Sequence, residues 1–412
     1  MNKKSVLIVS YYFPPMGFSG ALRGYYLAAF LAGRGYDVTV ITTEGVKYIA
    51  FDDSLKAPDG IRIIKLKTYD PQRYFSGKGK GQFGILRKIN AQIFPFDNKI
   101  LLFPSLKRAI ERIVKERGVD TIVSTSPPPS LHLSCMRIAK KYGINWIVDL
   151  RDALTDNQLK KSNGIVSFVE HREEKKIISA ASKITVTTEN ILVKLKEKYP
   201  NLRDKIVLVR NGFSKIDFKK AKKIKMQKEK INIAYISRIS HLTDIESILK
   251  ALRENDDFVL HFAGVDATGT LNDLIERYEV DGNVIRYGYL PHEDALSLMK
   301  SADILLITLA AVEGMEDVTT AKLYEYFGAG KPILLIAPEG TEAEKLIKRE
   351  RAGECVRNGA TDLIADAIRR LYGKKGCVNP QRYTWEHSFE LFLDYTDNKD
   401  NYRKKKREVE NN

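Results

Sequence analysis

The chain has 412 residues, which is longer than a single hydrophobic core usually grows, so we expect two α/β domains. No run of about 18 uncharged apolar residues occurs, and this argues against a membrane-spanning helix. The formal net charge of +16 is compatible with a polyanionic partner or an anionic membrane surface.

The N-terminus enters an apolar run almost at once, at residues 5–10. This run is too short for a signal peptide and no cleavage site follows it, so we interpret it as the first buried strand of a cytoplasmic protein. The three cysteines are scattered and share no metal-ligand or disulfide spacing, so we expect them to be reduced and structural.

The first half of the chain alternates short apolar runs with amphipathic stretches. Two strands, 5–10 and 36–42, flank a helix over 22–33, and this βαβ unit implies parallel strands. The same pattern continues with strands at 60–67, 121–124, 146–149, 183–187 and 206–210, and with helices at 106–117, 130–142 and 165–181.

A change in composition divides the chain. Residues 214–230 are mostly lysine and polar residues, so we place a basic linker there, between a first domain at 1–213 and a second at 231–382. The second domain repeats the alternation, with strands at 231–236, 258–262, 284–288, 304–307 and 332–335. Two doubly wound domains facing across a cleft follow, with ligands expected at the carboxyl ends of the strands.

The first strand leads into a loop, residues 11–20, that contains Gly17 and Gly20 and precedes a helix. Glycines allow a close approach of the backbone to a ligand, and a helix N-terminus favours an anion. The spacing is not G-x-G-x-x-G, which argues against a nicotinamide-dependent dehydrogenase. A simple tight turn is the alternative.

Three charged residues, Asp149, Arg151 and Asp152, follow the strand at 146–149. Charges at the end of a buried strand are costly unless they are paired or functional. An acidic group here could orient an acceptor hydroxyl, or Arg151 could simply neutralise its neighbours.

Residues 313–332 contain a more specific set of candidate ligand-binding residues than the two loops of the first domain. Thr319 or Thr320 can cap a helix that ends at Gly328 or Gly330, and the free amides at its start could hold a diphosphate. Asp317 and Glu325, eight residues apart, could place one carboxylate beside a transferred sugar and the other at a ribose. The alternative is a solvated acidic helix with Lys322 as a local charge partner.

The order of these motifs resembles that of the family-4 retaining glycosyltransferases of GT-B fold, particularly cell-envelope members. The resemblance spans nearly the whole chain and is carried by residues 12–17, 149–152, 209–213, 288–292 and 322–326. Residues 383–386 are similar to the family's final segment, which implies that a C-terminal helix, within 383–412, crosses back to the first domain.

The resemblance implies that a nucleotide-sugar binds the C-terminal domain. Glu325 would then bind the ribose, and Asp317, where the family usually has glutamate, would lie near the sugar. Arg238 matches an arginine that contacts the diphosphate, but Asp244 stands where a lysine is expected, so Arg238, Lys322 and helix amides would neutralise the phosphates. The full set of expected donor-binding residues is Gly17, Arg238, Gly288, Tyr289, Thr319, Thr320, Lys322 and Glu325.

On the acceptor side, Arg151 replaces the histidine common in the family. Asp152 therefore becomes the candidate for acceptor positioning, with Asp149 and Arg151 beside it. In a retaining enzyme of this type the leaving diphosphate helps to deprotonate the acceptor, so the catalytic set reduces to Asp317, Asp152 and Arg238, without a protein nucleophile. No convincing D-x-D motif occurs, so no metal and no other cofactor is expected.

The predicted function is transfer of a hexose from a nucleotide-sugar to a glycan or lipid-linked acceptor, and nucleic acid is not an expected partner. A sugar-nucleotide epimerase and a catalytically silent glycan-binding subunit remain as alternatives. The aromatic and basic stretch at 75–103, with Lys78, Lys80, Arg87 and Lys88, is typical of a segment that binds an anionic membrane on its inner face. The alternative is that its apolar residues pack into the first domain's core.

Overall fold

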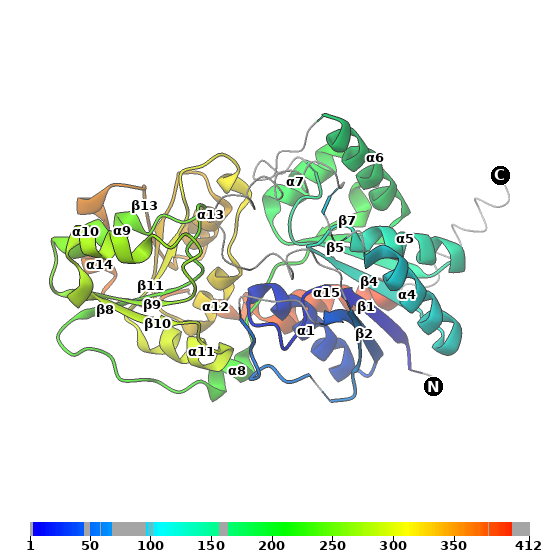
Figure 1. Ribbon diagram of the computed structural model, residues 1–412, viewed down its shortest axis with the longest axis horizontal. Helices are drawn as coiled ribbons and strands as arrows, with labels where there is room; N and C mark the ends of the chain where they lie inside the picture. The colour runs from blue at the N-terminus through cyan, green and yellow to red at the C-terminus, as the bar shows by residue number, and fades with distance from the viewer. Residues whose placement is uncertain are drawn as a thin grey trace. The chain divides into compact units, whose positions relative to one another are not determined.

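The computed structural model describes residues 3–44, 50–57, 59–67, 96–97, 99, 102–155, 164–377 and 379–397. The chain divides into two compact units (Figure 1). Residues 1–51, 56–210 and 389–412 form the first, and residues 52–55 and 211–388 form the second. Each unit contains a parallel β-sheet covered by helices, as the alternating sequence pattern predicts.

The first domain has a seven-stranded sheet in the order β3-β2-β1-β4-β5-β6-β7. Helices α4 to α7 bury their apolar sides in one core cluster with β1 and β5, whereas α1 packs against the opposite side of β1 and β2. The strands are β1 (Ser5–Ser10), β2 (Asp37–Glu44), β3 (Arg62–Lys67), β4 (Thr121–Ser126), β5 (Asn145–Leu150), β6 (Lys183–Val186) and β7 (Ile206–Leu208). The helices are α1 (Ser19–Gly33), α4 (Phe103–Arg117), α5 (Leu131–Tyr142), α6 (Gly164–Ala180), α7 (Glu189–Lys198) and η2 (Pro200–Lys205).

The second domain has a six-stranded sheet in the order β10-β9-β8-β11-β12-β13. Its strands are β8 (Ile231–Ile236), β9 (Phe258–Ala263), β10 (Val284–Gly288), β11 (Ile304–Thr308), β12 (Ile333–Ile336) and β13 (Gly353–Val356). Its helices are α8 (Lys215–Lys220), α9 (Glu246–Arg253), α10 (Leu271–Tyr278), η3 (Asp281–Asn283), α11 (His292–Ser301), η4 (Met315–Asp317), α12 (Ala321–Ala329), α13 (Glu342–Arg349), α14 (Thr361–Leu371) and η5 (Pro380–Tyr383).

The segment predicted as a basic linker begins inside the second domain. Helix α8 buries Phe218 in that domain's core, and Ala221 follows it there. The many lysines around these two positions made the short helix look like a linker in the sequence. Phe218 and Ala221 are held in place because they pack into the core of the second domain.

Both sheets place their first strand between the second and the fourth. The connections that follow β1 and β4 therefore run in opposite directions, as do those that follow β8 and β11, and this opens a crevice at the carboxyl ends of the two neighbouring strands. In the second domain this switch point lies between β8 and β11.

The end of the chain pairs with the start of the second domain before it returns to the first. Phe213 donates its amide to the Tyr383 carbonyl at 2.9 Å and accepts from the Trp385 amide at 3.1 Å. Helix α15 (Trp385–Asp397) then brings Phe389 against Phe30 of α1, with ring centroids 5.9 Å apart. The C-terminal helix thus crosses back to the first domain, as predicted.

Most of the predicted membrane-binding stretch, including Lys78, Lys80, Arg87 and Lys88, lies outside the described residues. Phe96 and Leu102, which are described, are buried in the first domain's core. At these positions the structure therefore favours core packing. No described helix combines the length and apolarity needed to cross a bilayer.

Candidate active site

A pocket of about 210 Å³ lies at the switch point of the second domain. Residues just after β8, including Ser237 and Arg238, form one wall, and the end of β11 with the start of α12, Thr320 and Lys322, forms another. The pocket is therefore at the position where open α/β sheets bind their ligands.

Buried hydrogen bonds fix α12 beside this pocket. The Tyr326 hydroxyl donates to the Leu306 carbonyl of β11 and accepts from the Ile236 amide of β8, both at 3.2 Å. Gly330 ends the helix in a left-handed conformation, with φ of 67°, which a side chain would disfavour. The sequence around Tyr326 thus places the N-terminus of α12 against the strand ends.

The pocket has a positive lining. Arg238 is exposed, and among the described residues it has no hydrogen-bond or ion-pair partner. Lys322 contributes the second cation, and no carboxylate belongs to the described residues that line the pocket. Such a lining favours an anionic ligand.

Two threonine hydroxyls at the start of α12 have no partner within the described chain, although the Oγ1 atoms of Thr319 and Thr320 are both buried. Thr320 occupies the N-cap position, but its side chain makes no capping hydrogen bond. The predicted cap position is confirmed, since α12 begins after Thr320 and ends at Gly330, but neither threonine side chain makes the capping hydrogen bond. Because buried polar atoms are normally satisfied, both hydroxyls are suited to a ligand.

Glu325 is buried beside Lys322 and is only 4% exposed. The Lys322 ammonium donates to its Oε2 at 2.9 Å, and Nδ1 of His292 lies 3.6 Å from its Oε1. The amide of His292 in turn donates to Asp52 at 2.8 Å, which fixes the start of α11. The carboxylate is thus held between two basic side chains, with hydrogen-bonding capacity to spare.

The remaining second-domain candidates surround this core. Asp317 ends η4, directly before Val318, which lines the pocket. Asp244 instead accepts from the Ser247 amide at 3.1 Å and from the Asn358 side chain at 2.7 Å, so it stabilises the start of α9. This structural role explains why an acidic residue stands there.

Gly288 ends β10 and Tyr289 follows it, and neither is among the described residues that line the pocket. The Gly288 carbonyl accepts from the Gly264 amide at 2.7 Å. Gly264 has φ of 153°, and a Cβ there would lie 1.8 Å from the Ser237 carbonyl oxygen, so only glycine fits. Burial and the nearby Asp52 raise the pKa of Tyr289, which stays a neutral hydroxyl.

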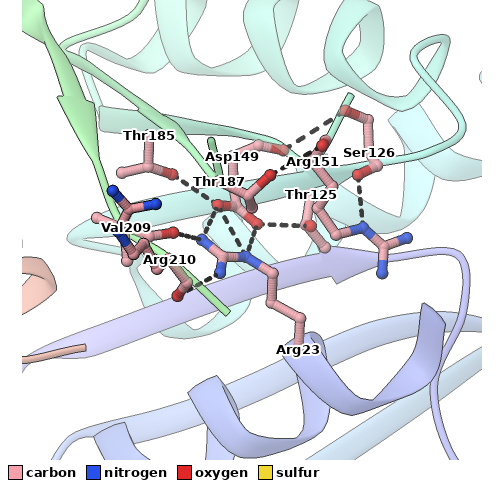
Figure 2. A network of polar contacts seen from close by, with 9 residues as sticks. All are labelled: Arg23, Thr125, Ser126, Asp149, Arg151, Thr185, Thr187, Val209 and Arg210. Carbon is pink, nitrogen blue, oxygen red and sulfur yellow. Dashed lines mark hydrogen bonds and ion pairs between the residues drawn. The ribbon is translucent and has the colours of Figure 1, made fainter. Parts of the chain in front are cut away.

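In the first domain, Asp149 lies in a closed hydrogen-bond network (Figure 2). Its carboxylate is fully buried and accepts from the Arg23 guanidinium at 2.7 and 2.8 Å, from Thr125 at 2.7 Å and from Thr185 at 2.6 Å. Arg23 also donates to the Val209 carbonyl at 3.0 Å. This network joins α1 to the ends of β4, β5 and β6.

Desolvation would raise the pKa of Asp149, but the Arg23 charge and the three side-chain donors hold it below its ordinary value. The ionised carboxylate has no surface open to an acceptor. Asp149 is therefore a structural residue, and its predicted place on the acceptor side is corrected.

Arg151 also serves the first domain's own loops. Its guanidinium donates to the Ser126 carbonyl at 2.8 Å (Figure 2) and to the Gly20 carbonyl at 2.5 Å. The Gly17 amide donates to the Ala50 carbonyl at 3.1 Å, so it is already engaged within the domain. Of the three acceptor-side candidates, Asp152 is the most exposed, Arg151 is partly buried and Asp149 is fully buried.

Comparison with known families agrees with the two-domain division. Residues 24–214 match the model described as Glycosyltransferase Family 4, and residues 216–383 match the one described as Glycosyl transferases group 1. Both halves of the chain belong to glycosyltransferase families. No curated protein of similar sequence matches the chain.

Solved structures show the same fold for this glycosyltransferase. Sucrose-phosphate synthase from Thermosynechococcus elongatus aligns with a TM-score of 0.69 at 14% identity, covering 95% of this chain and 98% of that one. WaaG, a glycosyltransferase involved in lipopolysaccharide biosynthesis, gives 0.57 at 16%, covering 96% of each. Anabaena HepE in complex with UDP gives 0.58 at 13%, covering 99% of each. The chain has the GT-B fold.

The structure brings Arg238, Thr320 and Lys322 of this glycosyltransferase to one pocket and places Glu325 next to it. Two residues had no role assigned from the sequence. His292 lay inside a recognised motif, and its place as the first residue of a helix was the available signal. Arg23 was the single cation in the apolar part of α1, which could have indicated a buried partner. Within the described chain, no cluster of three or more His, Cys, Asp or Glu residues could hold a metal ion.

Proposed function

We propose that the protein transfers a hexose from a nucleotide-sugar to a glycan or lipid-linked acceptor with retention of the anomeric configuration. The observation that carries this proposal is the positive pocket at the switch point of the second domain, with the buried Glu325 beside it. The pocket suits a diphosphate, and the carboxylate suits a neighbouring ribose.

The diphosphate would be held by charge and by helix amides. Arg238 and Lys322 line the pocket from two sides, and the start of α12 adds backbone amides that no side chain caps. The unpartnered hydroxyls of Thr319 and Thr320 supply further donors. These groups would stabilise the charge that develops on the departing diphosphate without requiring a metal.

The ribose would bind through Glu325. A carboxylate accepts several hydrogen bonds, and in this structure Lys322 supplies one at 2.9 Å while His292 lies within ion-pair distance. When a ribose hydroxyl donates to Glu325, Lys322 can turn its ammonium toward the diphosphate. Asp317, at the end of η4, would then contact the transferred sugar.

The proposal of retention follows the resemblance to the family-4 retaining glycosyltransferases and the match to the Glycosyltransferase Family 4 model. The described residues that line the diphosphate pocket include no carboxylate, so the proposed step forms no covalent bond to a protein residue there. In the proposed step the bond from that carbon to the diphosphate oxygen breaks while the acceptor oxygen bonds on the same face. The acceptor proton passes to the leaving diphosphate, and Asp152 orients the acceptor hydroxyl.

Two of the structural neighbours support the choice of substrates. HepE has been crystallised with UDP and UDP-glucose, and WaaG takes part in lipopolysaccharide biosynthesis. We therefore propose a cell-envelope acceptor presented to a cytoplasmic enzyme at the inner face of an anionic membrane.

The test begins with UDP and UDP-glucose as probes. Either should raise the melting temperature of the full chain, since a ligand that binds only the native state stabilises it. Arg238→Ala should abolish the shift, and Arg277→Ala, an exposed arginine of the same domain, should retain it. A panel with other bases follows if neither uridine probe binds.

Product analysis then separates the functions. Nuclear magnetic resonance of the transferred sugar should show the donor's anomeric configuration, and an inverted product would refute retention. An epimerised nucleotide-sugar formed without acceptor would identify an epimerase. Tight binding without transfer or hydrolysis of any donor would identify a silent glycan-binding subunit.

A further inference from the structure

Helix α6 exposes two large apolar side chains in the first domain. Ile165 is 82% exposed and Phe168 is 69% exposed, which are the highest values among the large apolar residues that the structure describes. They are three residues apart and therefore neighbours on the helix surface. An exposed apolar pair of this kind marks a contact site when other features point to the same partner.

The same stripe of α6 continues with basic residues. At about 100° per residue, Ile165, Phe168, Arg172, Lys175 and Lys176 fall within roughly 100° of one another. The opposite side of the helix is buried and carries Val166, Glu170, Glu174, Ile177 and Ile178. We call the five exposed residues the α6 stripe, which has an apolar N-terminal end and a basic remainder.

The α6 stripe keeps a positive charge after its local ion pairs are counted. Glu173 lies 2.5 Å from the Lys176 ammonium and 3.9 Å from Arg172, so one carboxylate faces three cations. Lys175 is exposed and has no partner among the described residues. Lys205 adds a further cation at the helix end, where it donates to the Ser179 carbonyl at 3.0 Å.

The buried face of α6 holds the helix in a fixed position. Glu170 accepts from the Phe96 amide at 2.6 Å, and Glu174 accepts from the Thr155 amide at 3.0 Å and the Tyr199 hydroxyl at 2.6 Å. Glu170 and Glu174 are thus directed inward, whereas Glu173 lies among the outward-facing basic residues. The stripe is presented by a helix that is anchored along its length.

We propose that the α6 stripe docks the protein on an anionic lipid surface. Ile165 and Phe168 would enter the boundary between headgroups and acyl chains, and the cations would contact lipid phosphates. Two apolar side chains are too few for a stable protein interface, which needs about 800 Å² from each partner. Ile165 and Phe168 lie at one end of the α6 stripe and the cations at the other. This order matches a bilayer surface, where charged headgroups lie outside the apolar acyl chains.

The inference rests on the proposed membrane-presented acceptor, but its test needs neither donor nor acceptor. The full chain is sedimented with vesicles of phosphatidylcholine alone and with vesicles containing phosphatidylglycerol. We expect binding to the anionic vesicles only, weakening as salt rises, because surface charges are screened. Loss of lipid binding with intact UDP-glucose binding would refute this inference and leave the proposed donor site standing.

Variants locate the contact. Phe168→Ser should lower partitioning onto anionic vesicles by about tenfold or more, as expected for one lost apolar anchor. Lys175→Gln should lower it about fivefold. The matched controls are Val193→Ser and Lys140→Gln, which alter exposed residues on α7 and α5 and should bind like the unaltered protein.

Three outcomes would overturn the proposal. Equal sedimentation with neutral vesicles would remove the role of charge, and unchanged binding of Phe168→Ser would remove the stripe from the contact. A dimer in lipid-free solution that Phe168→Ser dissociates would show that a second copy of the chain covers the stripe. Because Phe168 and Lys175 are exposed, circular dichroism should show that both variants remain folded.

Discussion

Asp149 in the first domain and Glu325 in the second are both buried carboxylates, yet their surroundings differ. Asp149 accepts two short hydrogen bonds from Arg23 and one each from Thr125 and Thr185. Glu325 accepts one hydrogen bond, from Lys322. The His292 ring lies 3.6 Å from its Oε1 and does not donate a hydrogen bond to it.

The difference teaches that burial alone does not distinguish a structural carboxylate from one that binds a ligand. A satisfied carboxylate stabilises the fold, because its partners offset the cost of desolvation. A carboxylate with spare acceptor capacity, next to a positive pocket, can exchange a protein donor for a ligand hydroxyl. Hydrogen-bond satisfaction separates the two cases.

The distinction between Asp149 and Glu325 would fail if Asp149 proved dispensable for folding. Asp149→Ala leaves Arg23 buried without its counter-ion, and we expect the free energy of unfolding to fall by about 3–5 kcal/mol. Chemical denaturation of the full chain measures this. UDP-glucose affinity per folded molecule should stay unchanged, because the second domain's pocket is intact.

A double variant sharpens the same point. Arg23→Met with Asp149→Leu removes both charges, so the loss of stability should be smaller than the sum of the two single losses. Strict additivity would mean that the two side chains do not stabilise the fold through each other.

A substitution of Arg238 tests whether the positive pocket next to Glu325 binds the donor. Arg238→Ala should reduce kcat by a factor on the order of 10² to 10³, the usual effect of removing one group that stabilises developing negative charge. Its stability should hardly change, since Arg238 is exposed. A collapse in melting temperature with intact activity per folded molecule would make Arg238 structural.

The fold was predictable because its signals are local. Buried parallel strands appear as short apolar runs, and amphipathic helices between them fix the βαβ order. The edge strand β13 was missed, since Gly353 to Val356 form only four residues with no alternation of their own. They become a strand because β12 offers them a pairing edge.

The meeting of Arg238 and Lys322 at one pocket was predictable, because Arg238 follows a strand end and Lys322 lies in the first turn of a helix. The sequence could not show that Asp149 is saturated, because its main partner, Arg23, lies 126 residues away. His292 reaches Glu325 only through the packing of α11 against α12. Contacts between distant segments decide which charged residues are free to bind.

Glu325→Gln sharpens the comparison at the donor site itself. The amide keeps the shape but loses half of the acceptor capacity, so donor affinity should fall by about 1.5–3 kcal/mol, or roughly 10- to 150-fold. Isothermal titration with UDP-glucose measures the change. Unlike Asp149→Ala, this variant should remain close to the unaltered protein in chemical denaturation, and unchanged affinity would remove Glu325 from the site.

The smallest effect is a pH dependence confined to the first domain. Burial lowers the pKa of His132 from its ordinary value to about 3, with the Asp149 charge opposing the shift. Between those two values the unfolded chain binds a proton that the folded chain does not, so stability falls as the pH falls. From about pH 7 to about pH 5.5 the free energy of unfolding should fall by about 1 kcal/mol because of this group.

Two variants test this origin. His132→Asn keeps a polar atom facing Ser124, whose hydroxyl lies 2.8 Å from Nδ1 of His132, and it should remove the part of the pH dependence that comes from His132. His387→Asn, which changes an exposed histidine, should leave the pH dependence as it is. If His132→Asn and the unaltered chain lose equal stability over this range, His132 is not buried in its neutral form, and the first domain's polar core is less closed than the network around Asp149 indicates.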